Sequence, residues 1–133
     1  MITRETDYAV RALLSLADFK DRMVSANELA EASGIPYRFL RGIMLKLSKS
    51  RLVYSSRGPN GGISMAYPLN ELSLLHIVLA LDPDSVTLNL CLKPGEYCQR
   101  DGTCIVHDKL KEVQEKLHNE LAAIKISSLL VKK

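Results

Sequence analysis

A single glycine, Gly34, separates two short segments with helical periodicity in the first half of this 133-residue chain. The segment before it opens on Ser25 and Glu28, a spacing typical of a capping box, in which the hydroxyl and the carboxylate each accept a hydrogen bond from a backbone N–H. The segment after it starts at Pro36, because proline lacks a backbone N–H and the first position of a helix does not need one. Its apolar residues follow the spacing of one buried helix face: Leu40, Ile43, Met44 and Leu47. Two helices joined by so short a turn predict a helix-turn-helix.

A dense turn signal follows the second predicted helix. Gly58-Pro59-Asn60-Gly61-Gly62 separates two segments of strand-like composition, 52–57 and 63–67. A β-hairpin directly after a helix-turn-helix is a wing, and apolar spacing predicts a further helix over 3–18. We therefore expect a winged helix-turn-helix DNA-binding domain over residues 1–70, in a fold that is mainly α with a small β-hairpin.

Charge is unevenly distributed, although the net charge is only +3. Between Glu31 and Glu71 the sequence holds six arginines and lysines and no acidic residue. A stretch of one sign within a globular pattern favours a polyanion such as double-stranded DNA, with a solvated surface as the alternative. The candidate DNA contacts are Tyr37, Arg38 and Arg41 on the outer face of the second helix, and Arg57, Asn60, Gly61 and Gly62 in the wing.

The second half of the chain, 71–133, predicts a linker helix, a cysteine-rich loop and a long helix. Ser73 is placed to cap a short apolar helix over 74–81, and loop-forming residues fill 85–104. From Ile105 onwards apolar residues alternate at spacings of three and four: Leu110, Val113, Leu117, Leu121 and Ile124. This seam favours pairing with a second copy, so residues 105–126 are interpreted as a dimerisation helix. Packing of the seam against its own domain is the alternative.

Three cysteines and a histidine fall within seventeen residues, as Cys91-x6-Cys98-x5-Cys104-x2-His107. Thiolates and neutral imidazole suit zinc, iron or an iron–sulfur cluster, and the spacing alone does not choose among them. An odd number of clustered cysteines argues against a disulfide framework. We therefore interpret 85–107 as a metal or redox site, with free thiols as the alternative.

Other classes of protein are disfavoured. No uncharged apolar run approaches the roughly 18 residues of a membrane helix, and the charged N-terminus does not resemble a signal peptide, so we expect a cytoplasmic protein with no membrane partner. No nucleophile–base pair or phosphate-binding glycine loop stands out, so an enzyme is not expected.

Several motifs, taken in order, carry a resemblance to one family. They are the opening Thr6-Asp7-Tyr8-Ala9-Val10-Arg11-Ala12-Leu13, the Ile35-Pro36 turn, Leu52-Val53, Arg57-Gly58-Pro59-Asn60-Gly61-Gly62 and the three cysteines. In this order and at these distances they resemble the iron–sulfur-cluster-sensing winged-helix transcription regulators of the IscR/NsrR/RirA type. The resemblance covers nearly the whole chain.

The resemblance implies a homodimer whose long helices cross at the interface, and a near-palindromic operator. It also implies an iron–sulfur cluster on Cys91, Cys98 and Cys104. The fourth ligand would be His107, as in 2Fe-2S proteins of the family, or Asp7 of the partner subunit, as in 4Fe-4S proteins. The 2Fe-2S form with His107 is favoured, because Cys-x2-His is the more local arrangement. Arg41 stands where IscR-like proteins carry an acidic residue, which implies a different operator.

The leading hypothesis is a DNA-binding regulator, a repressor, whose operator binding responds through the cluster to iron or cluster status, redox or nitric oxide. One alternative is the same fold without a cluster, regulated by thiol oxidation or a protein partner. Another is a zinc-stabilised DNA-binding module.

Overall fold

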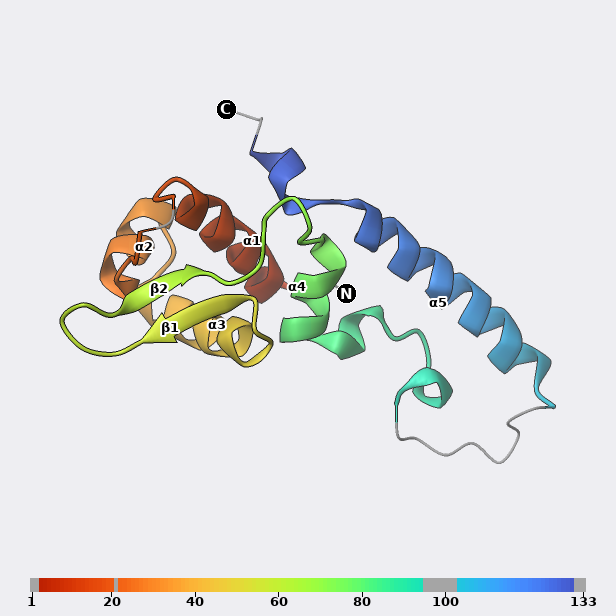
Figure 1. Ribbon diagram of the computed structural model, residues 1–133. Coiled ribbons are helices and arrows are strands. Elements are labelled where there is room, and N and C mark those ends of the chain that lie inside the picture. The colour runs from red at the N-terminus through yellow and green to blue at the C-terminus, as the bar shows by residue number, and fades with distance from the viewer. Residues whose placement is uncertain (1–2, 21, 95–102, 131–133) are drawn as a thin grey trace.

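The computed structural model describes residues 3–20, 22–94 and 103–130 (Figure 1). Its elements are α1 (Arg4–Ala17), α2 (Ala26–Ser33), α3 (Tyr37–Lys49), β1 (Val53–Ser56), β2 (Gly62–Met65), α4 (Leu74–Leu81), the 3-10 turns η1 (Pro83–Val86) and η2 (Leu90–Leu92), α5 (Ile105–Ala123) and η3 (Ile126–Leu129). The expected fold, mainly α with one antiparallel hairpin, is confirmed.

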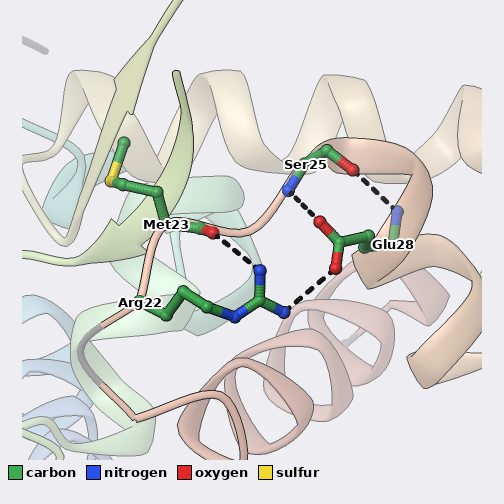
Figure 2. A network of polar contacts seen from close by, with 4 residues as sticks. All are labelled: Arg22, Met23, Ser25 and Glu28. Atoms are coloured by element: carbon green, nitrogen blue, oxygen red, sulfur yellow. Dashed lines mark hydrogen bonds and ion pairs between the residues drawn. The ribbon is translucent and has the colours of Figure 1, made fainter. Parts of the chain in front are cut away.

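The start of α2 carries the predicted capping box. The Ser25 hydroxyl accepts from the Glu28 N–H at 3.1 Å, and the Glu28 carboxylate accepts from the Ser25 N–H at 3.4 Å. Figure 2 shows that the other carboxylate oxygen faces Arg22, at 3.0 Å. Gly34, in the left-handed conformation at φ 75°, ends the helix and sets the tight turn into α3.

The main core lies between α1, α3 and α4. α3 buries the four predicted residues, Leu40, Ile43, Met44 and Leu47, and therefore leaves its opposite face open. Ile77 of α4 and Ile126 of η3 are fully buried in the same core. The chain thus returns after α5 to complete the core that the first three helices begin.

The hairpin is shorter than the sequence predicts. The expected strand 52–57 is shortened to Val53–Ser56, and the expected strand 63–67 is Gly62–Met65, which begins one residue earlier and ends two residues earlier. Val53 lies opposite Met65 and Ser56 opposite Gly62. The hairpin is anchored by an isolated bridge between Ile63 and Val24, in which each residue donates to the carbonyl of the other, at 2.7 and 2.9 Å. The bridge fixes the wing against the segment that leads into α2.

The long helix α5 begins at Ile105 as predicted, but it ends at Ala123 rather than at residue 126. It ends there because the next residues pair with the start of α4 and the segment just before it: Ile124 accepts from the Leu74 N–H and Ile126 donates to the Leu72 carbonyl. A second small core joins Val78 of α4, Val86 of η1 and Leu121 of α5. The remainder of α5 extends away from α1–α3 (Figure 1).

The segment between α4 and α5 is expected from the sequence to be loop over 85–104, but the 3-10 turns η1 and η2 lie within it. No helix among the described residues is long and apolar enough to cross a membrane.

Candidate functional site

The open face of α3 carries the residues that the sequence predicts as DNA contacts. Tyr37, Arg38 and Arg41 are all exposed. The Arg41 guanidinium lies 5.8 Å from the centre of the Tyr37 ring, a cation–π arrangement that orders a long side chain before any ligand arrives.

A groove of about 540 Å³ separates α3 from the hairpin and brings the two predicted halves of the DNA site together. Tyr37 and Arg41 line it from α3, and Arg57 lines it from the wing. Arg38 faces the other flank of α3, where it lines a hollow of about 350 Å³ with Arg4, Tyr8 and Phe39. Asn60 is exposed near the tip of the wing.

The wing glycines have roles within the fold. A Cβ atom on Gly61 would overlap the backbone of Ser56 and Arg57. A Cβ atom on Gly62, which has φ 146°, would lie 2.7 Å from the Val24 carbonyl oxygen. Both glycines are therefore required by the tight turn and by the bridge to Val24, whether or not DNA touches them.

The groove also contains residues that the sequence did not single out. Gly42, Ser55 and Ser56 line it. Gly42 follows Arg41 and lies one helical turn after Arg38, so a helical wheel places it at the edge of the same face. Ser55 and Ser56 carry no such signal, because either face of a short strand could have been the open one.

The cysteine site is described in part. Cys104 caps the N-terminus of α5, where its Sγ accepts from the His107 N–H at 3.4 Å. The His107 Nδ1 atom is buried and has no hydrogen-bond partner among the described residues. Cys91 lies in η2 and, like Cys104, is a half-buried free thiol. Cys98 lies outside the described residues.

The described residues bring Cys104 and His107 together, but within the described ranges no group of three or more metal-ligating side chains is formed. The other candidate fourth ligand, Asp7, is exposed on α1 and pairs with Arg11 at 3.0 Å. Of the two candidates, His107 is the one whose buried ring nitrogen, as far as the described part of the chain shows, has no hydrogen-bond partner and lies beside a cysteine.

Known proteins resemble the chain along nearly its whole length. A family model named Rrf2, described as that of an iron-dependent transcriptional regulator, matches residues 2–132. A protein of Aquifex aeolicus assigned as an HTH-type transcriptional regulator is 34% identical over 125 residues, which cover 92% of this chain and 86% of the relative.

Two solved structures share the fold. T. potens IscR is 21% identical with a TM-score of 0.68, over 98% of this chain and 85% of that one. Staphylococcus aureus CymR in an oxidized form is 19% identical with a TM-score of 0.67, over 100% and 98%. At these identities the two structures show the fold alone, whereas the family model and the Aquifex relative show the family. The chain belongs to the Rrf2 family of transcription regulators.

Proposed function

We propose that the chain is a homodimeric repressor whose binding to a near-palindromic operator is controlled by an iron–sulfur cluster. Cys91, Cys98 and Cys104 would be ligands, with His107 as the fourth in a 2Fe-2S cluster. The description of the family as iron-dependent supports an iron centre of this kind. Asp7 of the partner subunit, with a 4Fe-4S cluster, is the competing assignment.

The DNA half of the proposal rests on the groove between α3 and the wing. Arg41, ordered by Tyr37, would reach a guanine edge in the major groove, where a guanidinium donates to O6 and N7 together. Arg57, across the groove, would neutralise phosphate, with Asn60 at the wing tip. Arg38, on the other flank of α3, would contact the adjoining backbone.

The cluster half rests on one observation: the buried Nδ1 of His107, which has no hydrogen-bond partner within 3–20, 22–94 and 103–130, lies one helical turn after Cys104. A buried nitrogen without a partner is costly, and metal ligation would relieve that cost. The His107 N–H donates to the Cys104 sulfur, which lies at the N-terminus of α5. Such a cluster, when bound, supplies a centre that reacts with oxidants and nitric oxide. His107 and Cys104 would hold it at the start of α5.

The dimer rests on the outer part of α5. Val106 and Val113 are 61% and 53% exposed, and Leu110 and Leu117, which each follow one of the valines by four residues, are half-buried. The spacing of these four residues makes one seam, which a second copy of α5 would cover. Twofold symmetry then predicts half-sites about 34 Å, or a multiple of it, apart.

The first test is the absorbance, iron and sulfide content of protein purified without oxygen. We expect a coloured protein with about two irons and two sulfides per subunit. Cys98→Ala should abolish the colour and His107→Ala should weaken or shift it, whereas Asp7→Ala should leave it unchanged. The reverse pattern for His107 and Asp7 would replace the fourth ligand. A colourless protein that cannot be reconstituted, or that holds only zinc, would contradict the proposal.

The second candidate is regulation by thiol oxidation without a cluster. It is favoured by the likeness to a CymR structure described as oxidized, together with the free thiols of Cys91 and Cys104. It predicts a colourless protein whose operator affinity changes with peroxide and recovers with dithiothreitol. Loss of that response in Cys91→Ser or Cys104→Ser would identify the thiol.

A further inference from the structure

Two side chains of α5 hold the segment that leads to Cys91. His118 lies 3.0 Å, through Nε2, from the Val86 carbonyl oxygen, and the Gln114 amide oxygen accepts from the Leu88 N–H at 2.9 Å. Gln114 and His118 are one turn apart on the helix, so both bonds lie on the same face. Val86 contacts His118 and Leu88 contacts the earlier residue Gln114, so the segment and α5 run antiparallel.

The two contacts lie where apolar burial ends. Val86 is 2% exposed and packs in the small core with Val78 and Leu121. Leu88 and Leu90, further along, are 42% and 64% exposed. Residues 88–90 are all exposed, so this part of the segment gains little from the hydrophobic effect, and the polar contact at Gln114 fixes its place on the helix.

The antiparallel course directs Cys91 toward the start of α5. Seven residues of helix separate Gln114 from His107, a rise of about 10 Å. Cys91 lies three residues after Leu88, and because Leu90–Leu92 form the 3-10 turn η2, this segment spans less than the roughly 10 Å of an extended chain. η2, which contains Cys91, does contact α5. A slip of one helical turn would shift Cys91 by about 5.4 Å along α5 relative to His107.

We infer that Gln114 and His118 are positioning residues that set the register of the Cys91 segment on α5 and so present Cys91 toward Cys104 and His107. This inference rests on the proposed function in taking these three residues as one site. It also gives that site a physical connection to the helix that carries the exposed dimer seam. The side chain at position 114 must accept a hydrogen bond from the Leu88 N–H, and the side chain at position 118 must donate one to the Val86 carbonyl.

Matched variants separate these requirements from general damage to the helix. Gln114→Met removes the acceptor at similar size, whereas Gln114→Glu keeps it. His118→Phe removes the donor, whereas His118→Gln keeps one. Lys116→Met is the control, because Lys116 is exposed on the same stretch of helix.

The readout is taken first on reduced apo-protein, so that it does not depend on a cluster. Amide exchange of Leu88 and the rate of Cys91 alkylation, both followed by mass spectrometry, should rise about two- to tenfold in Gln114→Met, the change expected from losing one hydrogen bond. Gln114→Glu and Lys116→Met should behave as wild type. Wild-type exchange and alkylation in both Gln114→Met and His118→Phe would overturn the inference.

Cluster retention is measured second. In protein that binds a cluster, Gln114→Met should shorten its lifetime in air several-fold, and Gln114→Glu should restore it. Unchanged lifetime in Gln114→Met would overturn the positioning role even if exchange had risen. If wild-type protein binds no cluster, the proposed function fails, while faster alkylation of Cys91 in Gln114→Met would still support the positioning of that thiol.

Discussion

The ammonium group of Lys46 on α3 lies 2.7 Å from a carboxylate oxygen of Glu5 on α1. The pair joins the helix with the basic face to the helix that supports it. Both side chains remain partly exposed, so the pair contributes little to stability. Its main consequence is electrostatic, because one of the positive charges of α3 is already neutralised within the domain.

Lys46 should therefore contribute less to operator binding than Arg41. Arg41→Met should weaken binding by about 1–3 kcal/mol, the usual effect of losing a good base contact. Lys46→Met should leave affinity and its dependence on salt nearly unchanged. Fluorescence anisotropy over a range of salt concentrations measures both quantities. A fall of about one in the salt slope for Lys46→Met would mean that the Glu5 pair opens and that Lys46 binds phosphate.

The capping box at α2 should make stability depend on pH. The Arg22 guanidinium and then the Ser25 N–H, both hydrogen-bonded to Glu28, hold the pKa of that carboxyl below its usual value of 4.5 (Figure 2). Because the folded pKa is lowered, ionised Glu28 stabilises the fold above pH 4.5, and this contribution is lost as pH falls through the folded pKa. Glu28→Gln should therefore melt below wild type at pH 7, with the difference shrinking toward pH 3.

Thermal unfolding followed by circular dichroism checks this expectation. In an Arg22→Met background the largest cause of the lowered pKa is absent. Glu28→Gln should then produce a smaller pH-dependent difference. A difference that stays constant from pH 7 to 3 would contradict the role given to the ionised carboxylate.

Local features were predictable from the sequence, whereas long-range pairings were not. The capping box and the buried face of α3 follow from residues within a few positions of one another, and both are confirmed. The bridge between Val24 and Ile63 and the pairing beside Ser73 join distant segments, and neither leaves a periodic signal. The early end of α5 has the same origin, since it depends on that second pairing.

In the candidate site, too, the local arrangements were predictable and the long-range ones were not. Helical spacing placed Tyr37 and Arg41 on one face, but only the fold shows that Arg57 lies across a groove from them. Sequence spacing also suggested that Cys104 and His107 lie together, because both belong to one helical turn. The contacts of Gln114 and His118 were not predictable, because they pair helix side chains with backbone atoms of a separate segment.

Gly42 and Gly34 should respond in opposite ways to alanine. A Cβ atom at either position meets nothing within 4 Å, so space is not the difference. Gly42 lies within α3, where alanine is favoured over glycine, so Gly42→Ala should raise stability by about 1 kcal/mol. Gly34 has φ 75°, so Gly34→Ala should lower stability by about 1–2 kcal/mol. Urea unfolding of the two variants measures both changes, and a loss of stability in Gly42→Ala would show that the main chain there is constrained by something other than helix propensity.

A charge placed in the seam of α5 should separate the proposed dimer. Val113 is exposed within the single chain, so Val113→Glu should not disturb the core, but burial of its carboxylate between two copies would be strongly unfavourable. Asn119→Glu adds the same charge at an exposed position of the same helix and serves as the control. Light scattering coupled to gel filtration should give a monomer for Val113→Glu and a dimer for Asn119→Glu and for wild type. If Val113→Glu remains dimeric, the seam does not form the interface; if wild type is itself monomeric, the homodimer proposal is wrong.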